Sequence, residues 1–102
     1  DYLQLLSIEL AIVAGEYRAG GKLPSVRELA AEAAVNPNTM QRAMQELEAR
    51  GLINTQRTAG RTITEDETMI QALRQQKAQE QIAQFWAAMQ KLGFTQAEAL
   101  SL

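Results

Sequence analysis

The stretch that decides the fold is LPSVRELAAEAAVNPNTMQRAMQELEARG, residues 23–51, which contains two helix starts. In the first, the Ser25 side chain can accept from the amide three residues on, while Glu28 reaches back to the amide of Ser25, so the pair forms a capping box. In the second, Asn36 suits the N-cap and Pro37 suits the first helical position, where its missing N–H would be unpaired in any case. The spacer between the two segments is too short for anything but a sharp turn.

Apolar residues recur at helical spacing behind both starts. They are Val26, Leu29, Ala30 and Ala33 in the first segment and Met40, Ala43, Met44 and Leu47 in the second. Gly51 then supplies a stop, because glycine readily takes the left-handed conformation that ends many helices. A short helix of this kind cannot stand alone. The pattern therefore predicts a helix-turn-helix whose second helix runs from residue 37 to about residue 50.

The face opposite the second apolar stripe is polar and lacks acidic residues at its N-terminal end. At about 100° per residue it carries Asn38, Gln41, Arg42 and Gln45. Glu46 and Glu48 come one turn later, as expected if the start of the helix meets DNA and its far end does not. This face favours a helix that reads base edges in a groove. An ordinary solvated helix face is the alternative interpretation.

A β-hairpin is predicted after Gly51. Residues 52–56 and 62–64 are typical of short strands, and residues 57–61, RTAGR, are typical of a turn. Arg57 and Arg61 flank Gly60 and give the tip two positive charges, which suit phosphates or a narrow minor groove. A plain solvated hairpin is the alternative.

Two helical regions flank this unit. Residues 2–14 are strongly apolar and predict a helix that covers the back of the helix-turn-helix, with surplus apolar surface available to a second subunit. Residues 64–67, TEDE, predict a capping box that opens a long helix to about Leu92. The first apolar block of this helix, Met69, Ile70 and Leu73, is expected to pack on the preceding domain.

The second apolar block of the long helix lies beyond the polar segment 74–81, and the pattern Thr95-x-x-Glu98 then starts a short last helix. A two-helix unit of this size is too small to bury its own apolar surface. We therefore expect it to pair with the same unit of a second copy. The predicted dimerisation residues are Ile82, Phe85, Trp86, Met89, Leu92, Phe94 and Leu100. A ligand pocket lined by Phe85 and Trp86 is the alternative.

Composition argues against several classes of protein. The 102 residues include no cysteine and no histidine, so disulfides, thiolate chemistry and the commonest metal ligand and general base are excluded. The acidic run 65–67 is better explained by a helix start than by a metal site. We expect no enzyme activity, no cofactor and no metal. With no long apolar run and no signal peptide, we expect a cytoplasmic protein without a membrane span. The chain begins at Asp1, and we expect a few preceding residues to be missing.

Three segments in this order resemble the winged helix-turn-helix of GntR-type bacterial transcriptional regulators. They are LPSVRELA (23–30), VNPNTMQRA (35–43) and LEARGLI (47–53), preceded by GEY (15–17) and GGK (20–22). The Asn-Pro-Asn-Thr start and the short remainder are most similar to the YtrA subfamily. The resemblance implies a mainly α fold with a small β-hairpin. It divides the chain into a winged helix-turn-helix DNA-binding domain at 1–64 and a helical dimerisation region at 65–102.

The resemblance also implies DNA-contacting positions. Together with the two hairpin arginines, these are Arg27, Asn36, Asn38, Thr39, Gln41, Arg42, Arg57, Gly60 and Arg61. The chain departs from the family where relatives often have arginine, at Pro37 and Gln41, so its base preference is expected to differ. It also has Thr58 where the wing commonly has glycine and Thr62 where an aromatic is common.

The expected function is that of a sequence-specific DNA-binding transcriptional regulator. A homodimer would bind an inverted-repeat operator in double-stranded DNA and repress transcription by blocking polymerase. The sequence leaves a small-molecule effector open. The alternative is a winged helix used as a protein-protein interaction module without DNA binding.

Overall fold

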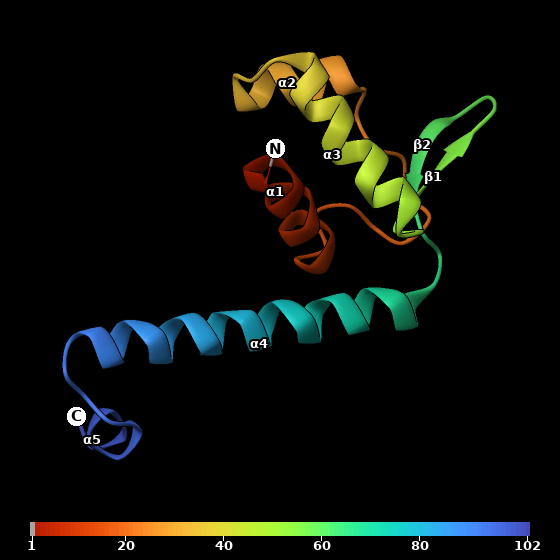
Figure 1. Cartoon of the computed structure of the whole chain (residues 1–102). Helices are drawn as coiled ribbons and strands as arrows, with labels where there is room; N and C mark the ends of the chain where they lie inside the picture. Colours follow the sequence, from red (N-terminus) through yellow and green to blue (C-terminus); the bar gives the residue numbers. More distant parts are fainter. Residues whose placement is uncertain (1) are drawn as a thin grey trace.

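The computed structural model describes residues 2–102 and is mainly helical, with one β-hairpin between the third and fourth helices (Figure 1). Its elements are α1 (Tyr2–Val13), α2 (Val26–Ala33), α3 (Pro37–Ala49), β1 (Ile53–Gln56), β2 (Gly60–Ile63), α4 (Glu67–Lys91) and α5 (Gln96–Leu100). This order confirms the predicted fold class, a winged helix-turn-helix followed by two further helices.

Both predicted helix starts in the central stretch are present. Ser25 Oγ accepts from the Glu28 amide at 3.1 Å, and Glu28 Oε1 accepts from the Ser25 amide at 3.2 Å. Asn36 Oδ1 accepts from the Asn38 amide at 2.8 Å and caps α3. Between the helices, Ala34 adopts the left-handed conformation with φ of 55°. A small side chain there limits the strain of that conformation and allows the sharp turn from α2 into α3.

One hydrophobic core joins α1, α2, α3, both strands of the hairpin and the start of α4. Met44 and Leu47 of α3 are completely buried at its centre. Buried side chains surround them from α1 (Ile8, Ile12), α2 (Leu29, Ala30), the hairpin (Ile53, Ile63) and the start of α4 (Ile70, Leu73). The predicted positions of α1 behind α3 and of the first apolar block of α4 against the winged domain are therefore confirmed. The division at residues 64 and 65 stays a prediction.

The wing is held by more than its own two strands. β1 and β2 pair antiparallel, with Ile53 opposite Ile63 and Gln56 opposite Gly60. The segment before α2 adds a bridge on the other edge of β2, where the Leu23 amide donates to the Arg61 carbonyl at 2.9 Å and the Ile63 amide donates to the Gly21 carbonyl at 2.8 Å. The second strand begins at Gly60, earlier than the predicted start at residue 62.

The start of α4 differs from the prediction. The helix is capped by Asp66, whose side chain accepts from the Met69 amide at 3.2 Å, and not by Thr64. Thr64 is buried and its amide donates to the Leu52 carbonyl at 2.9 Å, so its backbone still belongs to the edge of the hairpin. Its hydroxyl accepts from the Asp66 amide at 3.1 Å and shapes the turn between strand and helix.

The second half of α4 extends away from the core, and α5 lies near its far end (Figure 1). Among the described residues of α4, the buried side chains are Ile70 and Leu73, both in its first half. At the far end, Thr95 and Glu98 form the predicted capping box of α5. Across residues 2–102, no helix has the length and apolar character needed to cross a membrane.

Candidate nucleic-acid interface

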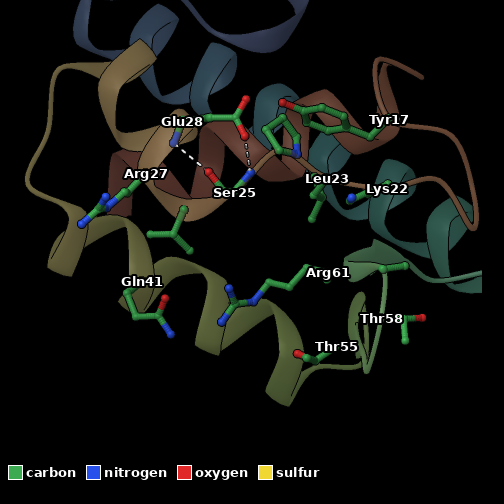
Figure 2. A pocket seen from close by; sticks show the side chains of 14 residues that line it. Tyr17, Lys22, Leu23, Ser25, Arg27, Glu28, Gln41, Thr55, Thr58 and Arg61 are labelled. Carbon is green, nitrogen blue, oxygen red and sulfur yellow. Dashed lines mark hydrogen bonds between the residues drawn. The ribbon is translucent and has the colours of Figure 1, made fainter.

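An open groove of about 940 Å³ lies between the start of α2, the outer side of α3 and the hairpin (Figure 2). Four of the predicted DNA-contacting residues line it: Arg27 from α2, Gln41 from α3, and Gly60 and Arg61 from β2. The α2 capping box places Arg27 in the first turn of its helix, and the Asn36 cap with Pro37 sets where Gln41 falls on α3. Side chains far apart in the sequence thus converge on one concave surface.

Positive charge predominates in the groove. Lys22, Arg27 and Arg61 line it together with a single acidic residue, Glu28, which is engaged with the Ser25 amide. The hydroxyls of Thr55 and Thr58 and the amide of Gln41 add neutral hydrogen-bonding groups. Cationic and neutral polar donors in such a groove suit contacts to phosphate and sugar oxygens. Among residues 2–102, no group of three or more acidic side chains is placed to hold a metal ion.

The other five predicted contact residues lie outside this groove. Asn36, Asn38 and Arg42 are exposed at the start of α3, and Thr39 beside them is half-buried. The Asn36 side-chain oxygen already accepts the Asn38 amide, so Asn36 acts as the cap of α3. Arg57 is exposed in the hairpin turn. The structure therefore separates a polar helix start from a cationic groove beside it.

Arg61 is held against α3. Its Nε donates to Glu48 Oε1 at 2.6 Å, and both side chains are partly exposed. The hydrogen bond from Arg61 lowers the pKa of Glu48, aided by Thr55 and opposed by partial burial of the carboxylate. This ion pair ties the wing to the second half of α3.

Some groove residues were not assigned a DNA contact from sequence. Thr55 lies opposite Arg61 in the hairpin register, and Lys22 pairs with Thr62 through the bridge beside β2. Strand alternation could have indicated Thr55, because its side chain must point to the same face as that of Arg61 across the ladder. From sequence, Lys22 is equally a phosphate contact or a solvated loop lysine, and the bridge between distant segments places it in the groove.

The predicted dimerisation residues form a partly exposed apolar surface on α4 and α5. Ile82 and Phe85 are 57% and 52% exposed, and Leu92 and Leu100 are 71% and 77% exposed. Trp86, Met89 and Phe94 are half-buried. The Phe85 and Trp86 rings meet edge to face, with centroids 5.0 Å apart. An exposed apolar surface of this kind is typical of an interaction site.

A capped helix-turn-helix, a hairpin wing and a cationic groove between them define a winged helix-turn-helix domain with a surface suited to nucleic acid. The family described as bacterial regulatory proteins, gntR family, matches residues 6–63, and the chain belongs to that family. It is thus a GntR-family transcriptional regulator with a DNA-binding helix-turn-helix.

Individual relatives agree with this assignment. The chain is 39% identical over 100 residues to the HTH-type transcriptional regulator YhcF of Bacillus subtilis, covering 97% of this chain and 83% of that protein. It is 50% identical over 52 residues to the HTH-type transcriptional repressor YtrA of the same organism, covering 51% of this chain and 40% of YtrA. A solved GntR family transcriptional regulator from Listeria monocytogenes superposes with a TM-score of 0.84 at 41% identity, covering 95% of this chain and 85% of that one.

Proposed function

We propose that this regulator binds an inverted-repeat operator in double-stranded DNA as a homodimer and represses transcription. The observation that carries the proposal is the groove itself, where Arg27, Gln41 and Arg61 converge from three elements beside the polar start of α3. The wing and the α2 segment flank α3 as two phosphate-contacting arms would flank a helix in the major groove.

In this arrangement the start of α3 reads bases. Asn38 or Gln41 makes paired hydrogen bonds to adenine, and Arg42 contacts guanine or a phosphate. Arg27 and Lys22 contact the backbone, where their charge displaces condensed counterions. Arg57 at the exposed turn of the wing lies over the adjacent phosphates or the minor groove. Base preference therefore rests on α3, and affinity rests on the groove cations.

The apolar surface of α4 and α5 supports dimerisation. In a single protomer, Leu92 and Leu100 are exposed to water. Packing against a second copy would remove this apolar surface from water, which is favourable. Two copies joined there present two α3 helices, and half-sites about one helical turn apart fit such a pair. Repression results if the bound dimer blocks polymerase, and a regulator of this kind works in the cytoplasm, where bacterial DNA lies.

The test is selection of bound sequences from a random duplex pool, with the Arg42→Ala variant in parallel. We expect wild type to enrich an inverted repeat. Arg42→Ala should lose preference at one base pair of each half-site if Arg42 contacts guanine, and should weaken binding without changing the preferred sequence if Arg42 contacts a phosphate. Arg18→Ala is the matched control, because Arg18 is also an exposed arginine but does not line the groove. Its selected sequences should match those of wild type.

Salt dependence separates DNA binding from a role in protein binding. Affinity for the selected duplex should fall steeply between about 50 and 200 mM salt, because several phosphate contacts each release counterions. If folded, dimeric protein enriches no sequence at low salt, the proposed function is wrong. A protein-interaction module would then be the better interpretation.

A further inference from the structure

Glu9 of α1 is a buried carboxylate that the binding groove does not use. It is 2% exposed, and its two oxygens face two different cations. Glu9 Oε2 lies 2.8 Å from Arg50 Nη1, and Glu9 Oε1 lies 2.7 Å from Lys77 Nζ. A buried carboxylate is costly unless it is paired and hydrogen-bonded, so this position is highly constrained.

The three residues come from three different helices. Glu9 lies in α1, Arg50 is the C-cap of α3, and Lys77 lies in the middle of α4. The end of the recognition helix and the helix that carries the dimerisation surface are therefore joined through one carboxylate. We call this cluster of Glu9, Arg50 and Lys77 the ionic junction.

The two halves of the junction have different roles. The pair of Glu9 with Arg50 lies within the winged domain. The pair of Glu9 with Lys77 joins α4 to that domain, at the point where the buried side chains of α4 have ended. One turn earlier, Arg74 Nη2 donates to the Val13 carbonyl at 2.9 Å. Among residues 2–102, Lys77 makes the most C-terminal ion pair between α4 and another helix.

Lys77 is strongly held. Its side chain is 11% exposed and lies within 3.3 Å of a second carboxylate oxygen, on Glu80. Burial alone would lower the pKa of Lys77, but hydrogen bonds and attraction from Glu9 and Glu80 raise it above its ordinary value. The raised pKa of Lys77 therefore favours its charged form beside Glu9.

Small rotations at this junction are amplified along α4. The helix continues for roughly 20 Å beyond Lys77, at about 1.5 Å per residue. A rotation of about 10° there would move the far end by roughly 3 to 4 Å, which is similar to the rise of about 3.4 Å per base pair. The angle of α4 thus determines the separation of two recognition helices joined by their α4 and α5 surfaces.

We propose that Glu9 and Lys77 are positioning residues that fix the angle between α4 and the recognition helix, and thereby select the spacing of the two operator half-sites. This inference rests on the proposed homodimeric DNA reader. Apolar contacts of Ile70 and Leu73 hold α4 against the core but are not directional. The two ion pairs of Glu9 add the direction, because they are satisfied together in one register of α1, α3 and α4.

The main variant is Lys77→Met, which keeps the aliphatic length and removes the link to α4 while leaving Glu9 paired with Arg50. The chain has no cysteine, so an Ala31→Cys change on the exposed side of α2 gives one spin label per protomer. Pulsed electron paramagnetic resonance then measures the distance between the two labels in the free dimer. We expect the distance distribution of Lys77→Met to be shifted or about twofold broader than that of the labelled wild type.

The second measurement uses unlabelled protein and a panel of inverted repeats whose spacer changes one base pair at a time. Wild type should prefer one spacer, and Lys77→Met should lose about fivefold or more of that preference while binding an isolated half-site as wild type does. Glu9→Gln should have the same effect if it folds. Lys77→Arg, which keeps the charge pair, should restore the wild-type profile.

Glu16→Gln is the matched control for Glu9→Gln, because it removes one carboxylate from an exposed position. Unchanged distances and an unchanged spacer profile in folded, dimeric Lys77→Met would overturn the inference, as would a wild type without spacer preference. A uniform loss of affinity at every spacer would also overturn it and leave the junction a purely stabilising feature. If wild type enriches no inverted repeat, the proposed function fails, which is a distinct result.

Discussion

Arg61 of β2 and Glu48 of α3 are joined by a 2.6 Å hydrogen-bonded ion pair between the wing and the recognition helix. Each side chain keeps part of its surface in water, so the pair adds at most about 1 kcal/mol to stability. Its larger effect is positional. It holds the guanidinium over the groove near Gln41 and not at the tip of the wing (Figure 2).

Glu48→Gln should bind DNA more tightly than wild type, by roughly 3- to 10-fold at low salt. The change removes one negative charge near the phosphates and leaves the Arg61 cation uncompensated. Fluorescence anisotropy of a labelled operator at two salt concentrations measures the gain. Glu46→Gln removes the same charge from an exposed position without releasing Arg61, so its gain should be smaller. Equal affinities for the two variants would contradict the idea that the ion pair with Glu48 limits contact of Arg61 with DNA.

The pKa of Glu48 should lie below its ordinary value of 4.5. The hydrogen bond from Arg61 favours the charged carboxylate, and this outweighs partial burial. Because the folded-state pKa is lowered, the stabilisation is present above the unfolded-state pKa and is lost as pH falls through the folded-state value. Carboxyl-carbon NMR titration of the protein should show the low value, and Arg61→Gln should return it toward 4.5. A titration midpoint unaffected by Arg61→Gln would show that the pair is not formed in solution.

The predictions that succeeded depend on residues close together in sequence. The Ser25 and Glu28 box, the Asn36 cap and the Thr95 and Glu98 box each use side chains within three positions of the amide they bind. Helical spacing likewise located the α3 core face, because period and burial are linked within one helix. Such signals are readable without knowing the fold.

The features that were missed depend on contacts between distant segments. In the sequence, Glu9 is a polar residue within a mainly apolar helix, and its partners Arg50 and Lys77 lie on other helices. Nothing local distinguishes it from a solvated glutamate. The pairing of Arg61 with Glu48 and the assignment of the α4 cap to Asp66 were missed for the same reason, since both depend on how the hairpin meets its neighbours.

Phe85→Glu should convert the proposed dimer to monomers. Phe85 is half-exposed in the protomer and contacts Trp86, so a carboxylate there would be desolvated by a second copy but tolerated by a free protomer. Sedimentation equilibrium measures the change in association. Affinity for the inverted repeat should fall by about 100-fold or more, while binding to a single half-site is retained. Gln84→Glu adds the same charge at the preceding exposed position and should remain dimeric.

Ser25→Ala should lower the free energy of unfolding by about 1 kcal/mol, because the Glu28 amide loses its capping acceptor. Urea unfolding followed by circular dichroism measures the loss, with an unchanged slope against urea expected for a local effect. Ser7→Ala provides the control, since Ser7 is exposed on α1 and caps no helix. A loss of equal size in the two variants would mean that the cap contributes nothing specific.

Leu47→Ala should lower the free energy of unfolding by about 2 to 5 kcal/mol, the usual range for a buried leucine replaced by alanine. Leu47 is 0% exposed on α3, in the core cluster that also includes residues of α1, the hairpin and α4. Leu3→Ala makes the same chemical change at a position that is 70% exposed, so it should cost less than about 0.5 kcal/mol. Urea unfolding of both variants must use one protomer concentration, because dimerisation makes apparent stability concentration-dependent. If the free energy of unfolding falls by similar amounts in the two variants, a shared core does not anchor α3. The idea of a rigid link from α4 through the core to the recognition helix would then also be wrong.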